Sequence, residues 1–158
     1  MRPDRSFLLR HPAHWLAFGF GAGLMPKAPG TWGTLVAFPM FFMARPWGDL
    51  AVLGLGAFVF ILGIWAAQVA GKSLGVADHG GIVIDEIAAF LIVLAFTPHH
   101  VAWWLAAFCL FRAFDIFKPW PIRLADRHIK GGFGVMFDDL LAAGYSVAAL
   151  WLARTALS

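Results

Sequence analysis

The apolar run at residues 50–70, LAVLGLGAFVFILGIWAAQVA, decides the fold class of this chain. It contains no charged residue. Its length matches the roughly 20 apolar residues that a helix needs to cross the hydrocarbon core of a bilayer. The run therefore predicts a membrane-spanning helix, and the rest of the sequence is interpreted around it.

The composition of the whole chain also indicates a membrane protein. Hydrophobic residues make up 61% of the 158 residues and charged residues 13%, whereas soluble domains average about 45–50% and about 25%. The 8 Trp and 16 Phe are residue types that gather where a bilayer meets water. The formal charge of +3 does not indicate nucleic-acid binding, because the basic residues lie between apolar runs. The single cysteine, Cys109, excludes an internal disulfide.

Other apolar stretches extend the pattern along the chain. Thr31–Ala44 is short and contains Pro39, so the sequence leaves open whether it spans. Phe7–Leu24 mixes aromatic with basic residues and is predicted to lie on the membrane surface. Residues 1–158 are thus predicted to be one all-α integral-membrane domain, with four to five spanning helices and an N-terminal interfacial helix. The three further spanning stretches are Gly81–Phe96, Val101–Phe117 and Val135–Ala153, the first two of them short.

The distribution of basic residues predicts the orientation. If all five segments span, Arg45 and Arg154 fall on one side. A larger basic set falls on the other side, which the positive-inside rule assigns to the cytoplasm. That set comprises Arg2, Arg5, Arg10, Lys27, Lys72, Lys118, Arg123, Arg127 and Lys130.

Five acidic residues lie inside predicted helices, near their cytoplasmic ends. An Asp at the centre of a spanning helix costs roughly 2.5–3.5 kcal/mol, so intramembrane acids are functional candidates by default. At about 1.5 Å of rise per residue, all five come close to one cytoplasmic plane although three helices carry them. They are Asp85, Glu86, Asp115, Asp138 and Asp139.

These carboxylates predict a divalent metal site. Unpaired carboxylates close together in a low dielectric repel one another and would hold protons instead of charge. All-oxygen ligation suits Mg²⁺ or Mn²⁺ better than zinc. Neighbouring residues on a helix point about 100° apart. In each of the pairs Asp85-Glu86 and Asp138-Asp139, one member is therefore expected to be a ligand and the other to support it. The sequence leaves open which.

Two glycine-containing loops and several cations surround the acids. The segments KAPGTWGT at 27–34 and KGGFG at 130–134 each lead into a predicted helix. Free amides at a helix start favour an anion, with Thr31 as an expected cap. Each loop alone is equally compatible with a simple bend. For Arg112, a structural role as the partner of Asp115 also stays open. The candidate phosphate-binding residues are Lys27, Gly30, Thr31, Thr34, Arg112, Lys118, Arg123 and Lys130.

Competing interpretations are weaker. Asp4, Asp49 and Asp126 are expected to be surface charges, and Asp78 to cap a helix. Gly71-Lys72-Ser73 lacks the first glycine of a P-loop and follows a helix instead of opening one. Cys109 lacks the arginine that a cysteine phosphatase carries six residues later. The interpretation that remains is hydrolysis by a water molecule that a metal ion activates.

Four ordered motifs closely resemble the phosphatidylglycerophosphatase A family. They are PGTWGT at 29–34, IDEI at 84–87, FRAFDIFKPWPIR at 111–123 and KGGFGVMFDD at 130–139. The resemblance runs from about Gly19 to Tyr145, and Asp78-His79 departs from the turn expected there. It implies a Mg²⁺-dependent hydrolase of the bacterial inner membrane, and the positive-inside rule predicts that its active site faces the cytoplasm. Its expected reaction converts phosphatidylglycerophosphate to phosphatidylglycerol and inorganic phosphate.

The expected mechanism uses the same five acids. Asp85, Asp115 and Asp139 are predicted to hold Mg²⁺, with Glu86 and Asp138 assisting and a carboxylate such as Glu86 accepting a proton from water. Two other classes stay open. A CDP-lipid phosphotransferase uses clustered Asp but needs a long single-segment motif that is absent here. An ion-coupled transporter would favour acids at mid-membrane. The sequence does not determine the oligomeric state.

Overall fold

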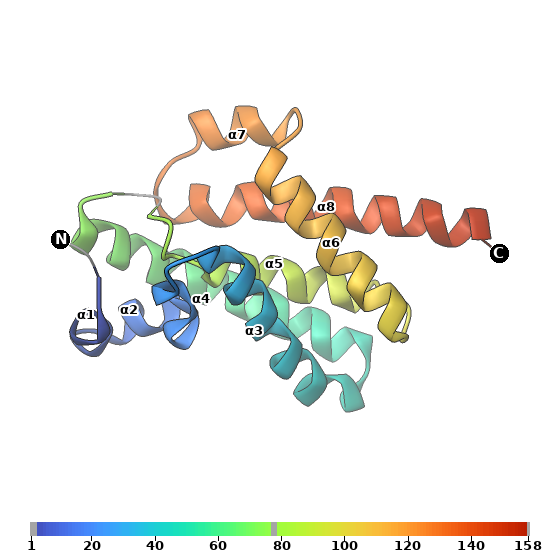
Figure 1. Cartoon of the computed structure of the whole chain (residues 1–158), viewed down its shortest axis with the longest axis horizontal. Helices are drawn as coiled ribbons and strands as arrows, with labels where there is room; N and C mark the ends of the chain where they lie inside the picture. Colours follow the sequence, from blue (N-terminus) through green and yellow to red (C-terminus); the bar gives the residue numbers. More distant parts are fainter. Residues whose placement is uncertain (1–2, 77–78, 158) are drawn as a thin grey trace.

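The computed structural model describes residues 3–76 and 79–157, and within these ranges the chain contains helices and no strand (Figure 1). The all-α prediction is therefore confirmed. Arg2, assigned to the cytoplasmic basic set, and Asp78, expected to cap a helix, lie outside the described residues.

The N-terminal segment folds into short pieces against the rest of the molecule. Helix α1 (Arg5–Leu9) is capped by Asp4, and α2 (Pro12–Ala17) by the side chain of His11. A 3₁₀ segment, η1 (Gly19–Leu24), follows. Each cap accepts a hydrogen bond from a backbone N–H of the first helical turn, which would otherwise have no partner in an apolar environment. The segment predicted as one interfacial helix or loop is thus two short helices and a 3₁₀ turn.

The next two helices form an antiparallel pair. Helix α3 (Pro29–Ala44) starts at a proline and leads through the short 3₁₀ turn η2 (Arg45–Trp47) into α4 (Asp49–Leu74). Gly75 ends α4 in the left-handed conformation, with φ of 73°, which glycine adopts without steric cost. The run at 50–70 therefore lies within a single helix that is slightly longer than predicted.

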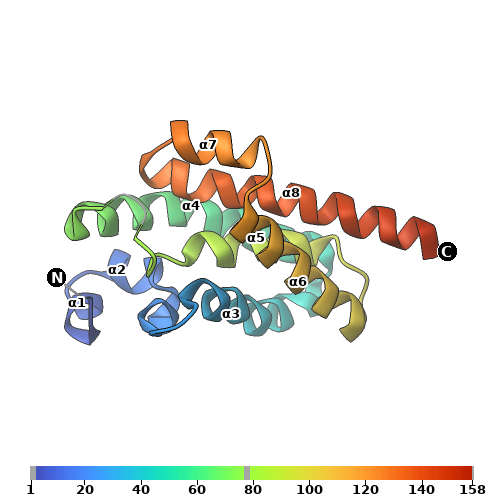
Figure 2. The same ribbon diagram turned by 45° about the horizontal axis from the view of Figure 1, so that its top comes forward.

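Helix α5 (Ile84–Ala95) is the centre of the bundle (Figure 2). Every residue in it except Ile92 is buried. It packs most extensively against α4, and also against α3, α6 and α8. Because α5 is covered by protein on all sides, whatever polar groups it carries face other helices. The acids near its start are therefore enclosed by the molecule.

The C-terminal half contains three helices, of which α6 and α8 pack against α5. Helix α6 (Val101–Phe117) has the predicted bounds. It begins at the His100 side-chain cap and ends at Lys118, which adopts the left-handed conformation immediately before Pro119. The short helix α7 (Ile122–His128) was not predicted; it lies against α8 (Gly131–Leu157) in both views (Figures 1 and 2).

A close approach of α4 and α8 depends on glycine. A Cβ added at Gly132 would lie 2.2 Å from the carbonyl oxygen of Ile64 and 3.0 Å from the backbone nitrogen of Gln68. Small residues allow helix backbones to approach in this way within membranes. The contact fixes the position of α8 relative to the bundle, and with it the acids that α8 carries.

Among the described helices, only α4 and α8 are long and apolar enough to span a membrane by themselves. Only 33% and 22% of their most apolar windows are buried, so most of this apolar surface faces outward. The predicted number of four to five spanning helices is not reached by this criterion. Helix α5, for example, starts at Ile84 rather than Gly81 and is only about 18 Å long, well short of the roughly 30 Å hydrocarbon core.

Candidate metal and phosphate site

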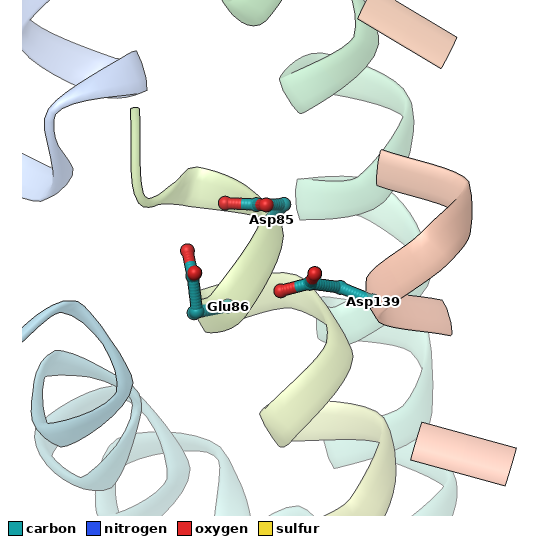
Figure 3. Close-up of side chains that lie close together, drawn as sticks. All are labelled: Asp85, Glu86 and Asp139. Atoms are coloured by element: carbon teal, nitrogen blue, oxygen red, sulfur yellow. The ribbon is translucent and has the colours of Figure 1, made fainter. Parts of the chain in front are cut away.

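Three buried carboxylates converge between α5 and α8 (Figure 3). Asp85 and Glu86 come from the first turn of α5 and Asp139 from α8. One carboxylate oxygen from each lies within 4.8 Å of the other two. We call Asp85, Glu86 and Asp139 the acidic triad. Such a group of oxygen ligands is a candidate site for a divalent cation.

The fold fixes the triad through the start of α5. The backbone N–H of Val83 donates a hydrogen bond of 2.7 Å to the carbonyl of Ala17, which ties this start to the end of α2. The positive end of the helix dipole then lies beside Asp85 and Glu86 and favours their negative charge. On the other side, α8 begins at Gly131 rather than Val135. Asp139 therefore lies about 12 Å along α8, deeper than the first turn predicted for it.

The donor set of the triad fits a hard cation. The exposed fractions of Asp85, Glu86 and Asp139 are 5%, 8% and 1%. Glu86 Oε2 and Asp139 Oδ2 are buried without a hydrogen-bond partner among the described residues. A buried carboxylate oxygen without a partner is costly unless a cation or proton compensates it. The chemistry of these oxygens therefore matches Mg²⁺ or a similar ion, and not a soft metal.

Asp115 on α6 belongs to an ion-pair network beside the triad. The Arg112 guanidinium donates a short hydrogen bond to Asp115 and lies 3.8 Å from Glu86 Oε1. Arg112 and Asp115 are three residues apart on one helix face. The structural pairing that the sequence left open for Arg112 is thus present. The Arg112 Nε is buried and has no hydrogen-bond partner among the described residues.

Lys118 connects the acids of α6 and α8. Its Nζ donates a 2.6 Å hydrogen bond to Asp138 Oδ2 and lies 3.6 Å from Asp115 Oδ1. Partial burial acts to lower the pKa of Lys118. The hydrogen bond to Asp138 and the charges of Asp138 and Asp115 outweigh it and raise the pKa above its ordinary value. Lys118 therefore carries its positive charge at neutral pH.

The five predicted acids thus form two groups. Asp85, Glu86 and Asp139 form the triad, whereas Asp115 and Asp138 are paired with Arg112 and Lys118. The structure brings all five into one neighbourhood, as expected from their depth. The predicted role of Asp115 and Asp138 as direct metal ligands stays a prediction.

The start of α3 covers the Arg112–Glu86 pair. A Cβ added at Gly30 would lie 3.1 and 3.2 Å from the two amino nitrogens of Arg112 and 3.2 Å from Glu86 Oε1. Thr34 is fully buried, and its hydroxyl donates to the Gly30 carbonyl at 2.7 Å. Thr31 does not cap α3, because the helix begins two residues earlier, after Ala28. The expectation of a Thr31 cap was wrong, although the helix start does lie at the site.

The remaining predicted cations are exposed and, within the described part of the chain, form no ion pair with Glu86 or Asp139. Lys27 is exposed, and the Lys130 ammonium donates to the carbonyl of Asp126 at 2.7 Å. Arg123 is exposed and donates to the carbonyl of Phe117 at 3.3 Å. Their roles in binding phosphate stay predictions.

The second glycine loop has a packing role that the sequence did not reveal. The N–H of Gly132 donates a 2.6 Å hydrogen bond to Gln68 Oε1 on α4. This amide is therefore satisfied by protein instead of being open to an anion. Gln68 was missed because a lone polar residue in an apolar run gives no signal of its partner 64 residues away.

Comparisons with known proteins agree with the geometry. Residues 15–154 match the family described as phosphatidylglycerophosphatase A. A Haemophilus influenzae protein of that name is 45% identical over 152 residues, which cover 92% of this chain and 90% of that protein. An Escherichia coli protein of the same name is 40% identical over 149 residues, covering 90% and 84%.

A third relative carries a different name. A Bacteroides thetaiotaomicron protein named "Putative phosphatidylinositol-3-phosphatase" is 40% identical over 147 residues, covering 86% of this chain and 89% of its own. No solved structure matches the chain.

Proposed function

The chain belongs to the phosphatidylglycerophosphatase A family, and on that premise we propose that it hydrolyses phosphatidylglycerophosphate at the acidic triad, with Mg²⁺. The reaction releases phosphatidylglycerol and inorganic phosphate, which makes the protein a lipid phosphatase. The observation that carries this assignment to particular residues is the acidic triad, buried directly beside the cations Arg112 and Lys118.

The metal would be held by carboxylates from two different helices. Asp85 from α5 and Asp139 from α8 are the proposed ligands, since their oxygens approach within 4.8 Å. When bound, a divalent cation polarises the phosphoryl group and lowers the pKa of a bound water. Glu86 Oε2, which has no hydrogen-bond partner in the described chain, accepts the proton of the attacking water.

Arg112 and Lys118 bind the phosphoryl group of the substrate. The Arg112 Nε–H, also without a hydrogen-bond partner in the described chain, is a donor for a phosphate oxygen. Asp115 and Asp138 hold these cations in place through their ion pairs. Donors that are already oriented stabilise the charge that develops in the transition state without further reorganisation.

We propose that the protein is a multi-pass enzyme of the bacterial cytoplasmic membrane. Helices α4 and α8 span the bilayer, and the shorter α3, α5 and α6 lie within it beside them. Large exposed apolar side chains on α4 and α8 support lipid contact, among them Phe58, Ile61 and Trp151. The positive-inside rule places the triad at the cytoplasmic face.

The assignment is tested by phosphate release from phosphatidylglycerophosphate in detergent micelles. Asp139→Asn and Asp85→Asn each remove a charged ligand while keeping the side-chain size. Each is expected to lower kcat/KM by on the order of 100-fold or more, since even indirect partners of a metal cost about 10–100-fold. Asp49→Asn is the matched control, because Asp49 pairs with His99 at the far end of the bundle.

A binding measurement separates metal binding from turnover. Mn²⁺ titration, followed by electron paramagnetic resonance, is expected to show a bound ion in the wild-type protein and in Asp49→Asn. The signal of the bound ion is lost in Asp139→Asn. An Asp139→Asn protein that binds Mn²⁺ normally and releases phosphate at the wild-type rate would refute the proposed metal site.

A further inference from the structure

A second, basic pocket adjoins the acidic site at the junction of α6 and α7. Its volume is about 360 Å³, within the range of small-molecule binding sites. Three cations, two of them arginines, line it together with an exposed tryptophan. The lining residues are Lys118, Pro119, Trp120, Arg123, Leu124 and Arg127.

Lys118 belongs both to this pocket and to the acidic site. Its Nζ lies 2.6 Å from Asp138 Oδ2 and 3.6 Å from Asp115 Oδ1, and the residue also lines the basic pocket. A single side chain therefore separates the acidic cluster from the two arginines. The two sites are therefore contiguous, as a ligand with two anionic groups requires.

The positive charges of the two arginines are available to a ligand. Arg123 and Arg127 are four residues apart on α7, so they project from the same helix face. Neither forms an ion pair within the described part of the chain, and the one hydrogen bond of Arg123 is made to a carbonyl. Two like charges at this spacing repel each other. A bound anion would relieve the repulsion, and guanidinium groups match the oxygens of a phosphate in pairs.

The fold holds this pocket in place. The Tyr145 hydroxyl of α8 donates a 2.7 Å hydrogen bond to the carbonyl of Trp120, and α7 packs along α8 (Figures 1 and 2). The Trp120 side chain is 76% exposed, as suits a residue at the membrane interface. The exposure of Trp120 fits a position of the pocket at the level of lipid headgroups.

We propose that the basic pocket binds the internal phosphodiester of the lipid substrate, while the terminal phosphomonoester lies at the acidic triad. The proposal rests on the proposed function, because phosphatidylglycerophosphate carries both groups, joined through one glycerol. Arg127 and Arg123 hold the diester, and Lys118 lies between the two phosphates. The pocket thereby selects lipids that carry a phosphodiester in addition to the terminal phosphomonoester.

The test compares two substrates in neutral detergent micelles. Phosphatidylglycerophosphate has the internal diester, whereas phosphatidic acid has a phosphomonoester only. Arg127→Gln is expected to lower kcat/KM for phosphatidylglycerophosphate by on the order of tenfold, as loss of a hydrogen bond to a charged group does. The value for phosphatidic acid stays unchanged, so the selectivity ratio falls. Arg127→Lys, which keeps the charge, is expected to restore part of the ratio.

A control variant and a second readout make the outcome decisive. Arg154→Gln changes an exposed arginine at the opposite end of α8 and is expected to leave the ratio unchanged. Glycerophosphoglycerol, a soluble diester without a terminal phosphate, is titrated into wild-type and Arg127→Gln protein by calorimetry. If glycerophosphoglycerol binds the wild type and binds Arg127→Gln more weakly, the pocket is supported even if neither lipid is hydrolysed. Failure to hydrolyse either lipid would contradict only the proposed function.

Two results would overturn the inference. An equal fall of activity on both lipids, seen only in anionic vesicles, assigns the arginines to bilayer lipid instead of to substrate. An unchanged selectivity ratio together with unchanged glycerophosphoglycerol binding removes the pocket from recognition altogether.

Discussion

At the scale of single residues, the site is defined by an imbalance of charge. Within the described residues, the ion pairs of the five carboxylates are made with two cations, Arg112 and Lys118. A buried charge without compensation costs several kcal/mol. The excess negative charge is the physical reason to expect a divalent cation there, and the pairing of Asp115 and Asp138 concentrates that excess on the triad.

Arg112 is the residue whose loss disturbs this balance most directly. Arg112→Gln leaves Glu86 without its cation and leaves Asp115 with Lys118 alone, at 3.6 Å, and breaking a buried pair costs about 3–5 kcal/mol. We expect a lower melting temperature and loss of phosphate release. Arg112→Lys keeps the charge but not the planar guanidinium with its paired N–H donors. The melting temperature should therefore largely recover, whereas kcat should not. Arg5→Gln, at an exposed arginine of α1, is the control, and equal kcat in Arg112→Lys and wild type would contradict a phosphate-binding role.

At the scale of the elements, the site depends on how closely two helices pack. Asp85 and Glu86 are positioned by the start of α5, whereas Asp139 depends on the register of α8 against α4. That register is fixed by the contact of Gly132 with the backbone of Ile64. Protein interiors tolerate added volume poorly, because the neighbouring backbone must move.

Two glycines of α8 provide a matched pair of variants. In Gly132→Ala the new methyl group overlaps the Ile64 carbonyl, so we expect a loss of about 1–3 kcal/mol of stability and a fall in activity as α8 shifts. Gly144→Ala adds the same group on the same helix where nothing lies within 4 Å. Its melting temperature should equal or exceed that of the wild type. Equal melting temperatures for the two variants, measured in detergent, would argue against this packing.

At the scale of the whole molecule, the two ends of the bundle differ in chemistry. One pocket, at the start of α4 and the end of α8, is lined by Asp49, His99 and Arg154, and Arg45 lies in the turn before α4. Lys72 lies in the last turn of α4, and the acidic triad lies toward the starts of α5 and α8. Between them, the helices expose large apolar side chains. Exposed apolar surface on this scale is typical of contact with lipid. The molecule therefore has an apolar outer surface between two distinct polar ends.

Cysteine labelling tests the orientation that follows from this arrangement. In a Cys109→Ala background, Lys72→Cys and Arg45→Cys each place one thiol at an exposed position at opposite ends. A membrane-impermeant maleimide should label Lys72→Cys only in inverted vesicles and Arg45→Cys only in right-side-out vesicles. Labelling of both thiols from the same side would contradict a spanning arrangement, and the reverse pattern would place the site outside the cytoplasm.

Several features of the fold were predictable because their causes are local. The bounds of α6 were predicted correctly, since Pro119 follows its last residues and a helix ends before proline. The start of α5 was not, because the turn before it is held by the hydrogen bond between Val83 and Ala17, distant in sequence. Helix α7 was missed because it is short and gains its stability from packing on α8.

The sequence by itself determined that the chain is helical and apolar, which acids lie within its helices and which cations accompany them, because burial cost and helix period act along the chain. Only the tertiary structure decided which carboxylates meet. It separated Asp85, Glu86 and Asp139 from the ion-paired Asp115 and Asp138, and it placed Arg127 beside Lys118. Those outcomes depend on distances between helices, and such distances are set by packing at residues such as Gly132 that carry no chemistry of their own.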